Sequence, residues 1–265
     1  MKLHPSLVSS RVSYGPDASP VTQADTQSNE IICSYLGTIF PGIPIVSEEA
    51  RGAEKEVREM FWLVDPLDGT KDFLAGHPDF TINIALVKES RPVLGVIFAP
   101  AINELYYAYE GGGAFLAAAR EKACRIRVSS RSEPEQMVLV TSRYHGVGPE
   151  SSFAAEAGFA GVFPRGSSLK GCMVARGDAD VYLRLGNVHS WDICAMTAIV
   201  KQAGGKLTDL RGAELRFDEP ELLIQGFIAS NDSSHLRLLE LARKCSRDEK
   251  ASIKVGAALK DPDSG

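Results

Sequence analysis

The segment WLVDPLDGT places two carboxylates, Asp65 and Asp68, three residues apart. The apolar residues before Asp65 predict a buried strand, the next proline turns the chain, and Gly69 lets the backbone approach a ligand closely. Two carboxylates at one strand end suit Mg2+, which binds a few carboxylates together with water and phosphate oxygens. The backbone carbonyl of Leu67 is placed to be a further ligand. The segment therefore predicts a magnesium site, and the simpler alternative is a turn with two solvated aspartates.

Three further acidic positions accompany this pair. Glu48 follows the apolar run IPIVS, Asp25 lies in the first turn of a predicted helix, and Asp192 starts another helix after a loop. A helix that begins near Thr70 would direct the free N–H groups of Gly69 and Thr70 toward the same place, where they could hold a phosphate. Taken singly, Asp25 and Asp192 are also explained as carboxylates that complement a helix dipole.

The elements that must position these acids begin with a half that is mostly sheet. Apolar residues at helical spacing predict a helix over residues 22–40. Apolar runs predict strands at residues 43–47 and 61–65, and alternating patterns with tight turns predict an antiparallel meander over residues 80–110. We expect Trp62 to pack the core beside the acids.

The second half begins after a charged, serine-rich stretch at residues 129–134, the candidate boundary. From there strands and helices alternate up to a final helix near residues 232–245, which favours a mixed or parallel α/β layer. Trp191 is expected in its core. The predicted division is an N-terminal metal-binding α+β half (1–133), a C-terminal α/β substrate half (134–246) and a disordered polar tail (247–265).

Composition excludes several classes of function. The net charge of −5 leaves no basic surplus to neutralise a nucleic-acid backbone, so we expect no nucleic-acid partner. The longest uncharged run, residues 31–47, contains two prolines and is too short for a membrane-spanning helix. The first residues lack the apolar core of a secretory signal, and we expect a cytoplasmic protein. Five scattered cysteines predict reduced, buried thiols and no zinc cluster. They are Cys33, Cys124, Cys172, Cys194 and Cys245.

The histidines give weaker signals. His77 and His189 have no partner at ligand spacing and are expected in loops or at the surface. His235 is expected on the solvated side of the last helix. Only His145 is a candidate for substrate contact.

Taken in order, five segments resemble the inositol monophosphatase superfamily of Mg2+-dependent, lithium-sensitive phosphatases. They are SPVTQAD (19–25), SEE (47–49), WLVDPLDGTKDF (62–73), GSSLK (166–170) and WD (191–192). Within it, the continuation Lys71–Phe73, the loop Ser142–His145 and Arg184 are similar to the CysQ-type 3'(2'),5'-bisphosphate nucleotidases of sulfur metabolism. Inositol-specific relatives carry an acidic residue where Arg184 stands, and an arginine suits a more anionic substrate.

The resemblance implies a set of metal ligands. A first Mg2+ would be held by Glu48, Asp65 and the carbonyl of Leu67, and a second by Asp65, Asp68 and Asp192. A third, weaker ion would lie near Glu48.

The resemblance also implies catalytic and substrate-binding roles. Thr70 and Asp25 would orient the attacking water, with Glu48 as a further acceptor, and Asp25 would assist the third ion through water. Lys170 and Arg184 are the candidates to meet a second phosphate. The implied substrate contacts are Leu67, Asp68, Gly69, Thr70, Ser142, His145, Gly166, Ser167, Ser168, Lys170, Arg184 and Asp192.

The fold implied is a layered αβαβα sandwich of the sugar-phosphatase type, an α/β (α+β) protein with its active site between the halves. The activity implied is hydrolysis of the 3'-phosphate of adenosine 3',5'-bisphosphate, and of its sulfated form, by water that two or three Mg2+ ions activate. The expected partner is a small phosphate monoester, and the expected state is a monomer or homodimer.

Two alternatives stay open at this point. One is a monoesterase for inositol 1-phosphate or another sugar phosphate. The other is a regulatory or scaffold member that kept the fold and lost turnover. The second is suggested by two departures from the family: only about eighteen residues precede the SPVT turn, where relatives carry an amphipathic helix, and Gly15 stands where relatives carry a lysine.

Overall fold

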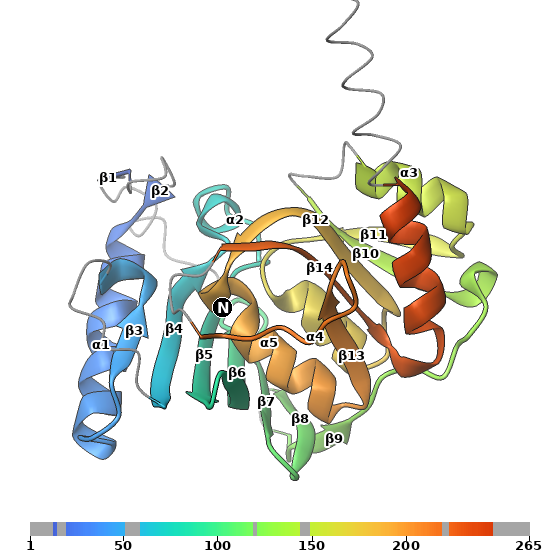
Figure 1. Cartoon of the computed structure of the whole chain (residues 1–265). Coiled ribbons are helices and arrows are strands. Elements are labelled where there is room, and N and C mark those ends of the chain that lie inside the picture. Colours follow the sequence, from blue (N-terminus) through green and yellow to red (C-terminus); the bar gives the residue numbers. More distant parts are fainter. Residues whose placement is uncertain are drawn as a thin grey trace, which may run out of the picture.

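The computed structural model describes residues 13–14, 20–50, 59–118, 121–143, 149–218 and 223–245. These residues form five layers in the order helix, sheet, helix, sheet, helix (Figure 1). The predicted αβαβα sandwich is confirmed. Gly15, His145 and the tail 247–265, about which the sequence made predictions, lie outside the described residues.

The first sheet has seven strands in the order β3-β4-β5-β6-β7-β8-β9. Its strands are β3 (Ile45–Ser47), β4 (Met60–Asp68), β5 (Thr81–Lys88), β6 (Arg91–Ala99), β7 (Glu104–Tyr109), β8 (Gly113–Ala118) and β9 (Cys124–Ile126). Only β3 and β4 run parallel, and every later neighbour is antiparallel. The predicted meander is therefore confirmed, and it extends two strands beyond the prediction. A separate pair, β1 (Ser13–Tyr14) and β2 (Pro20–Val21), precedes the sheet.

The second sheet has five strands in the order β11-β10-β12-β14-β13. They are β10 (Val138–Ser142), β11 (Gly161–Arg165), β12 (Val181–His189), β13 (Gly205–Asp209) and β14 (Leu223–Asn231). Strand β10 is parallel to β11 and β12, whereas β14 is antiparallel to β12 and β13, so the sheet is mixed as predicted.

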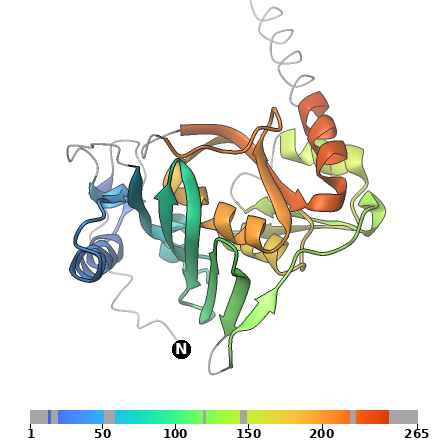
Figure 2. The same ribbon diagram turned by 60° about the horizontal axis from the view of Figure 1, so that its bottom comes forward.

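Helices fill the other layers. Between the sheets lie α4 (Leu169–Ala175) and α5 (Ser190–Gln202), which pack with both sheets into the main core (Figure 2). On the far face of the second sheet, α3 (Pro149–Ala157) and the helical residues 235–245 form a second core. The short α2 (Thr70–Leu74) follows β4 directly. Among the described residues, each helix is too short or too polar to cross a bilayer.

The outermost helix, α1 (Gln23–Ile39), packs on β3 and β4. It starts with a capping box, in which Thr22 Oγ1 accepts the Ala24 N–H and Asp25 accepts the Thr22 N–H at 2.8 Å. Its apolar residues predicted the helix correctly, but they do not all face the sheet. The side chains of Ile31 and Tyr35 are 59% and 67% exposed.

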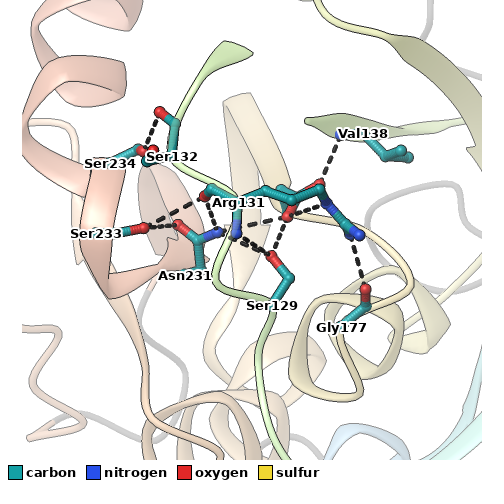
Figure 3. Close-up of polar contacts among 9 residues, drawn as sticks. Ser129, Arg131, Ser132, Val138, Gly177, Asn231, Ser233 and Ser234 are labelled. Carbon is teal, nitrogen blue, oxygen red and sulfur yellow. Dashed lines mark hydrogen bonds and ion pairs between the residues drawn. The ribbon is translucent and has the colours of Figure 1, made fainter. Parts of the chain in front are cut away.

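One buried carboxylate fixes the segment that joins the two sheets. Asp180 precedes β12 and is fully buried, and it accepts hydrogen bonds from Arg131 Nε at 2.9 Å and from the Val138 N–H at 2.7 Å (Figure 3). It also accepts from Ser129 Oγ and from Asn231 Nδ2. The predicted boundary at residues 129–134 lies in this joining segment.

Two predictions about single residues are wrong. His235 is buried, and its ring lies between Thr208 Oγ1 and Ser230 Oγ at 2.9 and 2.7 Å. Residues 232–234 form a 3-10 turn and the α-helix starts at His235, so a helical pattern counted from residue 232 has the wrong phase. All five cysteines are free, as predicted, but Cys124, in a short edge strand, is exposed and Cys33 is half-buried.

Candidate active site

Strand β4 brings the two central aspartates together through a break in its pairing. Asp65 lies opposite Asn83 of β5, and Asp68 lies opposite Thr81, with the register shifted between them. The two residues between the aspartates are therefore displaced from the ladder as a bulge. Burial, and then the neighbouring carboxylates with Asp68 among them, raise the pKa of Asp65, so the side chains of Asp65 and Asp68 lie near each other.

Two other elements add a carboxylate each. Glu48 follows β3, the parallel neighbour of β4, and Asp192 is the third residue of α5. Burial, then the charges of Glu48, Asp68 and Asp192, raise the pKa of Asp65 well above its usual range. Burial, then the charges of Asp68 and Glu48, raise the pKa of Asp192 in the same way. Acids from both halves of the chain therefore converge on one space.

The four carboxylates fit a hard divalent cation by the chemistry of their donor set. All donors are oxygens, and the main influences on the pKa of the buried Asp65 include three carboxylates and no cationic side chain. In the part of the chain that the structure describes, no three His, Cys, Asp or Glu side chains are already gathered at the spacing of a metal site. A bound cation would have to draw the acids closer, and it would also offset their repulsion.

In the described part of the chain, the hydrogen bonds that hold Asp68 all reach one oxygen, Oδ2. Its Oδ2 accepts from the Ser168 N–H at 2.7 Å, from Ser168 Oγ at 3.0 Å and from Asn83 Nδ2 at 3.3 Å. Ser168 comes from the second half and in turn donates to the carbonyl of Asp192 at 2.7 Å. The charge of Asp68 acts on both Asp65 and Asp192, so its side chain lies near these two acids.

The same arrangement recurs at the other two aspartates. Asp65 accepts the Leu67 N–H through Oδ1 at 3.1 Å, and Asp192 accepts the His189 N–H through Oδ2 at 3.0 Å. A backbone donor thus helps to orient each of these carboxylates.

The predicted pair for water orientation is in contact. Gly69, in the left-handed region at φ 91°, is the N-cap of α2, and the first residue of the helix is Thr70. Thr70 donates from Oγ1 toward Asp25 Oδ1 at 3.2 Å and the Leu67 carbonyl at 3.3 Å. Because the hydroxyl proton is directed to these acceptors, the Thr70 oxygen can accept a hydrogen bond from water.

A cleft of about 310 Å³ lies over these acids. The predicted site residues that line it are Glu48, Asp68, Gly69, Thr70, Ser142, Gly166, Ser167, Ser168, Lys170, Arg184 and Asp192. The predicted residues Asp25, Asp65 and Leu67 do not line it; all three are buried. His145 lies outside the described residues.

Two cationic side chains line the cleft from the second half. Lys170 is buried, donates from Nζ to the Ser167 carbonyl at 2.6 Å and lies over the Tyr182 ring. Burial lowers the pKa of Lys170 to about 8, an effect that Asp68 opposes and Arg184 reinforces. The Nε of Arg184 is buried and has no hydrogen-bond partner among the described residues. These two cations are placed to meet an anionic ligand.

Sequence reasoning missed residues in the cleft and behind it. His189 was expected in a loop or at the surface, but it lines the cleft and its ring stacks on Trp191 with centroids 4.6 Å apart. Asn83 was not singled out, although it holds both Asp68 and Ser168. Its signal was available, because a polar residue stands where the alternation of β5 requires a buried one. Trp62 and Trp191 are buried as predicted.

The model of the inositol monophosphatase family matches residues 6–247. The chain belongs to this family. Family enzymes depend on a metal ion. The 3'(2'),5'-bisphosphate nucleotidase CysQ of Buchnera aphidicola is 38% identical to the chain over 235 residues, which are 87% of each protein.

Solved structures agree with the family assignment. The Thermotoga maritima IMPase aligns with a TM-score of 0.79 at 30% identity and covers 92% of both chains. CysQ from Bacteroides thetaiotaomicron aligns with a TM-score of 0.71 at 31% identity, over 86% of this chain and 91% of its own.

Proposed function

We propose that this family member is a Mg2+-dependent phosphatase that removes the 3'-phosphate of adenosine 3',5'-bisphosphate and gives AMP and inorganic phosphate. Its sulfated analogue would lose the same phosphate. The observation that carries the proposal is the composition of the cleft, which is lined by converging carboxylates together with Lys170 and Arg184. The names of the relatives in the CysQ group support the same class of substrate.

The metal set in this proposal follows the acids. Glu48, Asp65 and the Leu67 carbonyl would hold one Mg2+, and Asp65, Asp68 and Asp192 a second. A third would lie near Glu48, with Asp25 acting through water. When bound, such ions lower the pKa of water, neutralise phosphoryl oxygens and stabilise a leaving alkoxide.

The chain's own groups then have separable tasks. Thr70 accepts a hydrogen bond from the attacking water and is itself oriented by Asp25. Ser168 keeps Asp68 directed into the cleft. Because attack by water needs no covalent intermediate, none of these residues has to act as a nucleophile.

The second phosphate of the substrate distinguishes this proposal from an inositol phosphatase. It would be bound by Lys170 and Arg184, and the unpartnered Nε of Arg184 supports that role. Ser142 and Gly166–Ser168 line the same region. His145, the other predicted contact, is part of the proposal on sequence grounds only, as are the cytoplasmic location and the monomeric or homodimeric state.

Phosphate release from a panel of substrates tests the proposal. The panel contains adenosine 3',5'-bisphosphate, inositol 1-phosphate and fructose 1,6-bisphosphate at equal Mg2+ concentration. We expect the highest kcat/KM for adenosine 3',5'-bisphosphate. Fastest turnover of inositol 1-phosphate would favour the monoesterase alternative instead. A folded protein that binds Mg2+ but releases no phosphate from any of them would favour the scaffold alternative.

A further inference from the structure

A group of charged residues joins the two halves beside the cleft. Asp79, in the loop before β5, is 1% exposed. Arg143 directly follows β10, and Arg165 is the last residue of β11. Asp79 Oδ1 accepts from Arg165 Nη1 at 3.1 Å, and Oδ2 accepts from Arg143 Nη2 and from the Gly166 N–H at 3.1 Å. Arg143 Nε also pairs with Asp72 at 3.5 Å. We call Asp72, Asp79, Arg143 and Arg165 the Asp79 cluster.

The two halves touch so closely here that only glycine fits. A Cβ on Gly166 would lie 2.5 Å from the Asp79 carbonyl oxygen and would also overlap the Asp72 carboxylate. The Gly166 backbone is therefore wedged against the first half, with its N–H directed at Asp79.

The chain that leaves Gly166 leads directly to the metal site. Ser167 has a left-handed backbone at φ 46°, and the next residue is Ser168, whose N–H and hydroxyl both bind Oδ2 of Asp68. Because Gly166 is fixed and lies only two residues before Ser168, the position of Gly166 determines where the two donors of Ser168 lie. Asp79 is thus linked to Asp68 by a hydrogen bond from Gly166, by the chain from Gly166 to Ser168 and by the hydrogen bonds from Ser168.

The charges of the cluster balance, with two aspartates and two arginines. The cluster thus adds no net charge to the cleft, and its effect on the site is one of placement. Removal of the buried Asp79 carboxylate would leave the Gly166 N–H and two arginines without their acceptor, so the loop would have to move to find another.

We propose that Asp79 is a positioning residue that, through Gly166 and Ser168, aims Oδ1 of Asp68 at the metal position; this rests on the metal site of the proposed function. Outer groups that orient a metal ligand contribute about 10- to 100-fold to metal affinity in other metal sites. Asp79 is one step further out, and we expect about a tenfold loss of Mg2+ affinity when it is removed.

Calorimetric titration of the full-length protein with Mg2+, without substrate, tests the inference. Asp79→Ala should raise the Mg2+ dissociation constant about tenfold, and excess Mg2+ should restore its kcat. Arg143→Ala, whose side chain is 29% exposed, should raise the constant by a smaller factor. Arg131→Ala is the matched control, because Arg131 is 36% exposed and also pairs with a buried aspartate, Asp180. Asp180 precedes the first residue of β12, whereas the last residues of β12 line the cleft. Arg131→Ala should lower the melting temperature and leave Mg2+ binding unchanged.

The path through Ser168 has its own test. If Asp79 acts through Ser168, the double variant Asp79→Ala with Ser168→Ala should lose Mg2+ affinity by a smaller factor than the product of the factors in the two single variants. A folded Asp79→Ala that binds Mg2+ like the wild type, or an equal loss in Arg131→Ala, would overturn the inference. If Asp79→Ala does not fold, Arg143→Ala decides in the same way. A wild-type protein that binds no Mg2+ would overturn the proposed metal site as well.

Discussion

Replacement of Arg184 by alanine should separate substrates with two phosphates from those with one. Arg184 lies in the wall of the cleft, and its Nε is buried without a hydrogen-bond partner in the structure. It also disfavours the charged form of the neighbouring Lys170. A phosphate bound between them would supply acceptors for Nε and offset the repulsion between the two cations.

The magnitude follows from one charge-assisted interaction, which contributes roughly 1.5 to 3 kcal/mol. At 1.4 kcal/mol for each factor of ten, Arg184→Ala should raise KM for adenosine 3',5'-bisphosphate about 10- to 150-fold. For adenosine 3'-monophosphate, which lacks the second phosphate, KM should change less than about threefold, because no such interaction is lost. Arg184→Lys keeps the charge without the planar donor set and should fall between.

The assay is steady-state phosphate release with both nucleotides at saturating Mg2+. Far-ultraviolet circular dichroism of each variant checks that it is folded. An equal rise in KM for the two substrates would refute the reasoning, because the guanidinium would then contact a part that both share.

Other residues give independent expectations. Asp68→Asn should lower kcat by more than about 100-fold in the phosphate assay, whereas its melting temperature should be kept because the amide oxygen can still accept from Ser168. Asp180→Ala should lower the free energy of unfolding, measured with urea, by about 3 to 5 kcal/mol, because the partners of this buried carboxylate lose their acceptor. Asp178→Ala is the control: it removes an ion pair of a half-exposed aspartate and should lower the free energy of unfolding by less than about 1 kcal/mol. Burial lowers the pKa of His235 to about 4, so between pH 6.5 and 4 the unfolded chain takes up a proton that the folded protein excludes. The contribution of His235 to folding stability should therefore fall by roughly 3 kcal/mol as the pH drops through this range, and the free energy of unfolding of the wild type should fall relative to that of His235→Asn by about that amount.

Residue types and spacing predicted most of the strands, helices and turns that depend on interactions between residues close in the sequence. The WLVDPLDGT run carries a strand and a left-handed glycine within nine residues, so residue types and spacing were enough to assign its two aspartates to one strand end. The predicted turn at Pro66 is wrong, because β4 continues to Asp68 and Pro66 lies in its bulge. The helix capped by Thr22 and the meander after residue 80 were equally accessible, because caps, periodicity and turn residues are local signals.

Contacts between distant segments could not be derived in this way. Ser168 meets Asp68 across 100 positions of sequence, and Arg143 meets Asp79 across 64. Neither pair has a spacing that a helix or strand would impose, so each depends on how the two sheets pack. His235 failed for a different reason, since a single 3-10 turn changed which side of the helix it occupies.

Hydrolysis of the 3'-phosphate of a nucleoside bisphosphate in this cleft can be followed by phosphorus NMR. The sample is adenosine 3',5'-bisphosphate incubated with the protein, with and without Mg2+. We expect inorganic phosphate and adenosine 5'-monophosphate in equal amounts, formed only when Mg2+ is present, and no product with Asp68→Asn. Formation of adenosine 3'-monophosphate, product without divalent metal, or no product from the folded wild-type protein would contradict this expectation.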